Sequence, residues 1–110
     1  MGHDIYGYNK AGEEIAYARF SMGNHNALIL YRLLNAYEYY AGVSGSGRGT
    51  TFSSEQIEEA LNVFEQQYNN KDSAHANYDF LRWDGKQIND FIKNCSTTAK
   101  KEGNVKVFFG

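Results

Sequence analysis

Residues 3–21, HDIYGYNKAGEEIAYARFS, form the segment that decides the fold of the N-terminal part of the chain. The run 3–9 contains an isoleucine and two tyrosines, and β-branched and aromatic side chains fit a pleated strand. Residues 9–12 follow with asparagine first and glycine fourth, as a type I turn prefers. The run 13–21 then alternates in polarity. Two such runs around a short turn containing glycine predict a β-hairpin.

The alternation in 13–21 assigns its side chains to two faces of the expected strand, because successive residues in a strand point in opposite directions. One face carries Glu14, Ala16, Ala18 and Phe20, and the other carries Ile15, Tyr17, Arg19 and Ser21.

The C-terminal residues 104–110, NVKVFFG, also alternate and predict a strand. A single strand leaves its backbone N–H and C=O groups without partners, so we expect it to join the hairpin. The simplest arrangement is a three-stranded antiparallel sheet with the last strand beside the first.

Residues 27–40 predict a helix that is buried on most sides. Its only polar residues are Arg32, Asn35 and Glu38, which are three apart and form one narrow stripe. A helix that is apolar almost all round is expected in a core.

Three further helices are expected between residue 53 and residue 101. Ser53 and Gln56 form a capping box at the start of the first, with Phe52 and Ile57 placed for a hydrophobic staple. A short helix is expected over 74–83. Apolar residues at helical spacing predict another over 88–101, which Gly103 can terminate.

These elements give the order ββααα(α)β. We therefore expect an α+β fold in which a hairpin and a C-terminal strand form a three-stranded antiparallel sheet, covered by three or four helices. The 110 residues suit one domain, 1–110.

Composition excludes several classes of protein. The single cysteine, Cys95, cannot form an internal disulfide, and its place on the apolar stripe of a helix indicates a core residue. No stretch is long and apolar enough for a membrane helix, and the start of the chain does not resemble a signal peptide. We expect a cytoplasmic protein that does not bind or span a membrane. The net charge of −2 argues against nucleic acid as a partner, although the C-terminal part is basic.

A glycine-rich segment, 42–50, offers a hypothesis for anion binding. Glycine N–H groups near a helix start can surround a phosphate, with help from Ser44, Ser46, Arg48 and Thr50. The segment has the glycine spacing of a phosphate loop. It lacks the lysine and the Ser/Thr of that motif, and it is expected between two helices, so nucleotide hydrolysis is rejected. The other interpretation is a connecting loop.

Histidines and acids supply a second possible site, formed by His3, Asp4 and His25. No histidine or cysteine spacing matches a metal motif, and no nucleophile stands beside a base in the sequence. We expect no metal, no cofactor and no catalytic residues. Surface or capping histidines are the alternative interpretation.

Tyrosines suggest contact surfaces. Tyr37, Tyr39 and Tyr40 end the expected helix 27–40, while Tyr6, Tyr8 and Tyr17 lie on the hairpin. Tyrosine is enriched at interfaces because it combines apolar area with a polar tip. A sheet face carrying tyrosines and Phe108 would be a pairing or binding surface, unless most of these rings line the core.

The leading hypothesis from the sequence is a non-enzymatic interaction module that self-associates or docks a protein partner through a tyrosine-rich surface. The rival is a small enzyme or an anion-binding domain that uses the segment 42–50. Binding of single-stranded nucleic acid is a third option, and it needs a positively charged groove.

Overall fold

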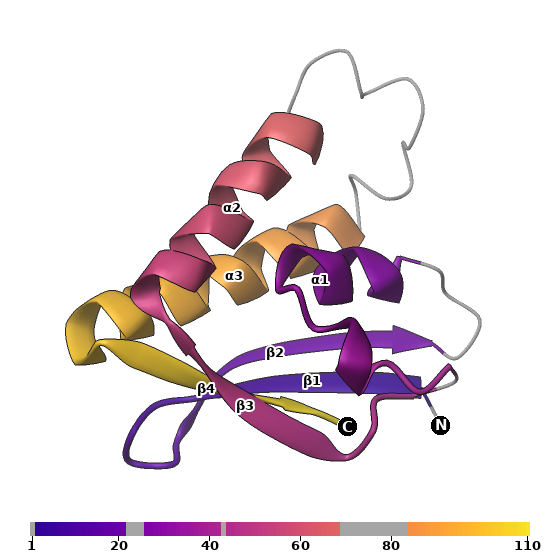
Figure 1. Cartoon of the computed structure of the whole chain (residues 1–110), viewed down its shortest axis with the longest axis horizontal. Coiled ribbons are helices and arrows are strands. Elements are labelled where there is room, and N and C mark those ends of the chain that lie inside the picture. Colours follow the sequence, from indigo (N-terminus) through magenta and orange to yellow (C-terminus); the bar gives the residue numbers. More distant parts are fainter. Residues whose placement is uncertain (1, 22–25, 43, 69–83) are drawn as a thin grey trace.

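The computed structural model describes residues 2–21, 26–42, 44–68 and 84–110. These residues form an α+β fold in which one antiparallel sheet carries all the α-helices on a single face (Figure 1). The elements in chain order are β1 (Gly2–Tyr8), β2 (Glu14–Ser21), α1 (Ala27–Leu33), the 3₁₀-helix η1 (Tyr37–Tyr39), β3 (Arg48–Ser53), α2 (Ser54–Tyr68), α3 (Gly85–Glu102) and β4 (Asn104–Phe109). The helix expected over 74–83 lies outside the described residues.

The N-terminal hairpin is confirmed, with β1 and β2 antiparallel. Its turn is closed by the Gly12 N–H, which donates to the carbonyl oxygen of Asn9 at 3.0 Å. The side-chain oxygen of Asn9 also accepts from the Glu13 N–H at 2.9 Å. The asparagine at the first turn position therefore holds both ends of the turn.

The two ends of the chain meet at the centre of the sheet, whose strand order is β2-β1-β4-β3. The expected pairing of the last strand with the first is confirmed, with Ile5 opposite Phe109. Gly110 extends the pairing, since its N–H donates to the Asp4 carbonyl at 2.8 Å.

The sheet has four strands rather than the three expected, because part of the glycine-rich segment is the edge strand β3. It pairs with β4 from Arg48 opposite Phe109 to Ser53 opposite Asn104. Glycine here permits close backbone packing: a Cβ on Gly49 would lie 2.6 Å from the Val107 carbonyl oxygen. The glycines of the segment 42–50 indicated a loop, yet Gly49 lies in a strand and allows β3 to pack closely against β4.

A second correction concerns the helix expected over 27–40, because α1 ends at Leu33. Asn35 adopts a left-handed conformation with φ 54°, which no continuing helix contains. The Ala36 N–H donates to the Tyr31 carbonyl at 2.8 Å, and the Asn35 N–H donates to that of Arg32 at 3.0 Å. These two bonds form a Schellman motif, so Asn35 ends the helix.

The central position in the helical layer belongs to α3 and not to α1, which corrects the expectation of a helix 27–40 buried on most sides. Helix α3 contacts α2, β2 and β4. Its buried residues are Gly85, Ile88, Phe91, Ile92, Cys95, Ser96 and Ala99. Burial raises the pKa of the Cys95 thiol to about 12, in keeping with the core position that its helical spacing predicts.

The capping signals at both ends of the helical layer are confirmed. The Gln56 side chain accepts from the Ser53 N–H at 2.8 Å, and the Ser53 hydroxyl accepts from the Gln56 N–H at 3.2 Å. Gly103 has φ 93° and its N–H donates to the Ala99 carbonyl at 2.7 Å, which closes α3.

A β-bulge in β2 corrects the predicted faces of this strand. Ala16 lies opposite Gly7, but Glu14 lies opposite Tyr8, so Ile15 is an extra residue without a partner. Ile15 packs against the core, and Glu14 projects on the same side of the sheet as Tyr8. An inserted residue reverses the alternation beyond it.

The close approach of β3 to β4 predicts that Gly49→Ala lowers the free energy of unfolding by roughly 1–3 kcal/mol, because the added methyl collides with the backbone. Urea denaturation measures the change. The control is Thr51→Ala on the same strand, which we expect to cost less than about 1 kcal/mol. Equal stability of Gly49→Ala and the wild type would contradict this packing.

The left-handed conformation of Asn35 predicts different results for two substitutions. Asn35→Ala keeps the Cβ at positive φ but removes the short polar side chain that helps asparagine to adopt this conformation, so it should cost about 1 kcal/mol of stability. Asn35→Gly should leave the thermal midpoint at or above that of the wild type, since glycine adopts this conformation without strain. A lower midpoint for the glycine variant than for the alanine variant would show that the backbone conformation is not the cause.

Candidate functional site

One face of the sheet is not covered by any helix of the described ranges (Figure 1). Side chains that project from this face are exposed or half-buried, whereas most of their neighbours along β1, β2 and β4 are buried. We call this surface the open face. On β1, β2 and β4 it carries Asp4, Tyr6, Tyr8, Glu14, Tyr17, Arg19, Lys106 and Phe108, and β3 adds Gly49 and Thr51, which lie opposite Phe108 and Lys106. Four of these ten residues are aromatic, and they gather on the three neighbouring strands β2, β1 and β4.

Three of these rings form a row across neighbouring strands, the aromatic row Tyr17–Tyr6–Phe108. Tyr6 lies on β1 opposite both Tyr17 on β2 and Phe108 on β4. The Tyr6 ring centroid is 5.0 Å from that of Tyr17 and 6.3 Å from that of Phe108. Tyr8 extends the cluster along β1, 6.1 Å from Tyr6. Rings at these separations attract one another and limit each other's motion.

A polar group holds one end of the aromatic row. The Tyr17 hydroxyl donates to the Asp4 carboxylate at 2.6 Å, and the Arg19 Nε lies 3.8 Å from the same carboxylate. This hydrogen bond raises the pKa of Tyr17 above its usual value, because deprotonation would lose the bond and place two anions together. The Tyr17 ring, with 43% of the residue exposed, therefore has a defined orientation in the free chain.

Next to the aromatic row, residues of opposite charge lie on the two sides of Tyr8 on the open face. Glu14 lies on one side of Tyr8, on β2, and Lys106 on the other side, on β4. Within the described part of the chain neither side chain forms an ion pair. A depression of about 430 Å³ adjoins Lys106 and is lined by Tyr8, Asn9, Lys10, Gly12, Lys106 and Phe108.

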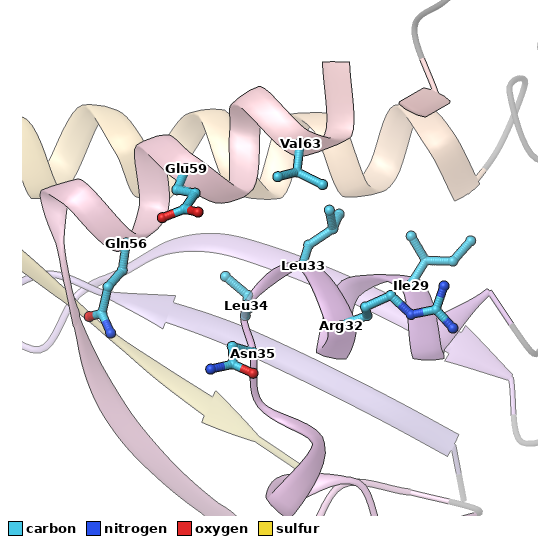
Figure 2. Close-up of a pocket in the computed structure, with 8 residues that line it drawn as sticks. All are labelled: Ile29, Arg32, Leu33, Leu34, Asn35, Gln56, Glu59 and Val63. Atoms are coloured by element: carbon cyan, nitrogen blue, oxygen red, sulfur yellow. The ribbon is translucent and has the colours of Figure 1, made fainter. Parts of the chain in front are cut away.

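A second cavity, of about 470 Å³, lies between α1 and α2. Figure 2 shows Leu33 of α1 pointing towards Val63 of α2, and the remaining lining residues are Ile29, Arg32, Leu34, Asn35, Gln56 and Glu59. The lining contains neither histidine nor cysteine, serine or threonine. Its charged side chains are the Glu59 carboxylate and the Arg32 guanidinium. Arg32 donates from Nε to the Tyr37 hydroxyl at 2.8 Å.

The possible site of His3, Asp4 and His25 is described only in part, and the two residues that the structure describes, His3 and Asp4, do not lie together. His3 and Asp4 are successive strand residues, so they point to opposite faces of the sheet. Asp4 belongs to the open face, while His3 is buried beneath the helices. His25 lies outside the described residues.

The His3 imidazole instead connects three parts of the fold. Its Nε2 lies 3.1 Å from the Gly42 carbonyl oxygen, which can only accept, so Nε2 carries the proton. Its Nδ1 then accepts from the Tyr31 hydroxyl at 3.0 Å. Tyr40 stacks on the ring at 5.3 Å between centroids. Burial raises the pKa of Tyr31 to about 12, which keeps this donor protonated.

The residues of the anion hypothesis are divided between a loop and a strand. Arg48 and Thr50 lie on β3, whereas Ser44 and Ser46 precede it. The N–H groups of Gly45 and Gly47 donate to the carbonyls of Gly110 and Phe109, both at 2.8 Å. The N–H of Ser46 donates to Tyr39 at 2.9 Å. Three of the amides that would hold an anion thus already have partners, and anion binding stays a prediction.

The tyrosines predicted to form an interface, Tyr37, Tyr39 and Tyr40, lie in different environments. The Tyr39 ring stacks on Phe109 at 4.9 Å, and Tyr40 stacks on His3. Tyr37 is 49% exposed. The role of these residues in an interface stays a prediction, and the larger exposed group of aromatic side chains is the one on the open face.

The sequence indicated most of the open face but not all of it. Alternation along the runs that form β2 and β4 is the signal that placed Tyr17 and Phe108 on a sheet surface. Glu14 was missed because the bulge at Ile15 has no marker in the sequence. The pairing of its strand with β1 had to be known first.

Comparison with known family models, with curated proteins and with solved structures finds nothing that matches this chain. In the described ranges no helix has the length and apolar character needed to cross a membrane. No group of three or more His, Cys, Asp or Glu side chains among the described residues is placed to hold a metal ion.

The buried hydrogen bond of His3 predicts that Tyr31→Phe lowers the free energy of unfolding by roughly 1–3 kcal/mol, because Nδ1 is left without a donor in the core. Tyr37→Phe is the matched control, since it removes a surface hydroxyl and should change stability by less than about 0.5 kcal/mol. Chemical denaturation of both variants gives the comparison. Equal costs would mean that the His3–Tyr31 bond does not contribute to stability.

Proposed function

We propose that this chain is a protein-interaction module that docks and self-associates through the open face of its sheet. The observation that carries the proposal is the aromatic row Tyr17–Tyr6–Phe108 on a sheet face that the described helices leave uncovered. No catalytic group takes part in this function.

The aromatic row has properties that favour binding. Tyrosine and phenylalanine contribute large contact areas with few rotatable bonds, so little conformational entropy is lost when they are covered. Packing among the rings and the Tyr17–Asp4 hydrogen bond already orient these side chains before a partner arrives. Preorganisation of this kind lowers the free-energy cost of association.

The charges on the open face favour a protein partner over a nucleic acid. Arg19 and Lys106 contribute positive charge, but Asp4 and Glu14 contribute as much negative charge to the same surface. A phosphate backbone requires an excess of cations, which a balanced surface does not supply. A protein surface with both signs of charge is the better complement.

The size of the open face indicates a weak and reversible contact. Four strands at about 4.8 Å spacing and about six residues of about 3.3 Å each cover roughly 400 Å². A standard stable interface buries about 800 Å² on each partner. The open face alone therefore suits a transient complex.

A concentration series tests the proposal. The wild type should self-associate as its concentration rises towards about 1 mM. This range detects an association whose standard free energy is about −4 kcal/mol. Tyr6→Ser should weaken the association about tenfold or more, because it removes the central ring of the row. Sedimentation velocity or light scattering provides the measurement.

Tyr37→Ser is the control for this experiment, because Tyr37 is an exposed tyrosine that lies on η1 and not on the open face. It should associate as the wild type does. A wild type that stays monomeric over the whole series would refute self-association. Equal weakening by both substitutions would place the contact elsewhere.

A further inference from the structure

We infer that the partner on the open face is a second copy of this chain, related by a two-fold axis that runs parallel to β1, and that Glu14 of each copy contacts Lys106 of the other. This inference rests on the proposed function, and it adds the geometry and the residues that specify the pairing.

The first argument is the position of two unpaired charges. Glu14 on β2 and Lys106 on β4 lie in one row on opposite sides of Tyr8. A two-fold axis parallel to β1 in the plane between two facing sheets places β2 of one copy over β4 of the other. Glu14 then faces Lys106 of the second copy, and symmetry produces this contact twice.

The same operation brings the aromatic rows together. Tyr17 of one copy faces Phe108 of the other, and the two Tyr6 rings meet near the axis. Sheets that pack face to face with nearly aligned strands lie about 10 Å apart and differ by about 30° in direction, a spacing that side chains from both sheets fill. The aromatic rows and the Glu14 and Lys106 charges are thus complementary under a single symmetry operation. The two Asp4 carboxylates meet near the axis, each with Arg19 of its own chain 3.8 Å away.

A two-fold axis perpendicular to β1 is the competing arrangement. It places Glu14 over Arg19 of the second copy, but Arg19 already lies 3.8 Å from Asp4 in its own chain. It also leaves Lys106 opposite Gly110, which has no side chain, whereas the parallel axis leaves in that position Arg19, which already has Asp4 as its neighbour. The parallel axis gives an ion-pair partner to Glu14 and to Lys106, which form no ion pair within the described part of one chain.

Association through the edge of β2 is opposed at Arg19. The Gln87 side chain from α3 accepts from the Arg19 N–H at 2.6 Å and donates to its carbonyl at 2.9 Å. A covered edge cannot add another strand at this position. This disfavours strand addition at the β2 edge of the sheet, whose other edge is β3.

A charge-exchange experiment tests the inference. Glu14→Lys and Lys106→Glu should each weaken self-association about tenfold, because each produces two like-charge contacts in the symmetric pair. Mixing the two variants in equal amounts should restore association as a heterodimer. The double variant Glu14→Lys/Lys106→Glu should associate as the wild type does. Both residues are exposed, and circular dichroism of each variant verifies that it is folded.

Each outcome of this experiment supports or overturns the inference. Restored association in the mixture supports the parallel axis. If Arg19→Glu instead of Lys106→Glu rescues Glu14→Lys, the perpendicular axis is correct and the inference is wrong, while the proposed function stands. The same holds if the wild type associates and no charge change affects it. A monomeric wild type overturns the inference together with the self-association on which it rests.

Discussion

The pairing of β1 with β4 is the constraint on which the rest of the structure depends. It joins the first and last strands at the centre of the sheet, so every other element lies beside or above this pair. Each of the two strands has a partner on both sides, which satisfies its backbone hydrogen bonds in both directions. The alternation of side chains along β1 then divides the molecule: His3 and Ile5 point towards the helices, and Asp4, Tyr6 and Tyr8 point away from them.

The placement of the described helices on one face explains why the other face carries tyrosine. Helix α3 lies over the centre of the sheet, with α1 and α2 beside it, so the aliphatic side chains of the sheet gather on that side (Figure 1). Tyrosine tolerates the opposite environment because its ring packs on neighbouring rings while its hydroxyl remains in contact with water or with a carboxylate. The Tyr17–Asp4 bond is an instance of this arrangement. Structure and proposed function thus have the same origin in the one-sided covering of the sheet.

Local chemistry predicted the elements whose ends are set by neighbouring residues. The Asn9–Gly12 turn, the Ser53–Gln56 capping box and the end of α3 at Gly103 each involve hydrogen bonds within a few residues, and all three are present. Prediction failed where a residue serves a distant partner. Gly49 allows close packing against β4, which lies more than fifty residues away in the sequence. Without knowledge of that partner, the glycine indicates a loop. Asn35 ends α1 because it adopts positive φ, a conformation that asparagine allows but does not require.

The sequence by itself determined the α+β class, the hairpin, the start of α2 and the tyrosines of one strand face, because periodicity and capping operate over short distances. Only the tertiary structure decided that β3 joins the sheet, that Glu14 lies beside Tyr8, and that His3 is buried while Asp4 meets Tyr17 and Arg19. Each of these depends on strand register, and register is fixed when all strands bury one common face. The open face also depends on strand register. Alternation in the sequence indicated many of its residues, but the pairing of the strands brought them together into one surface.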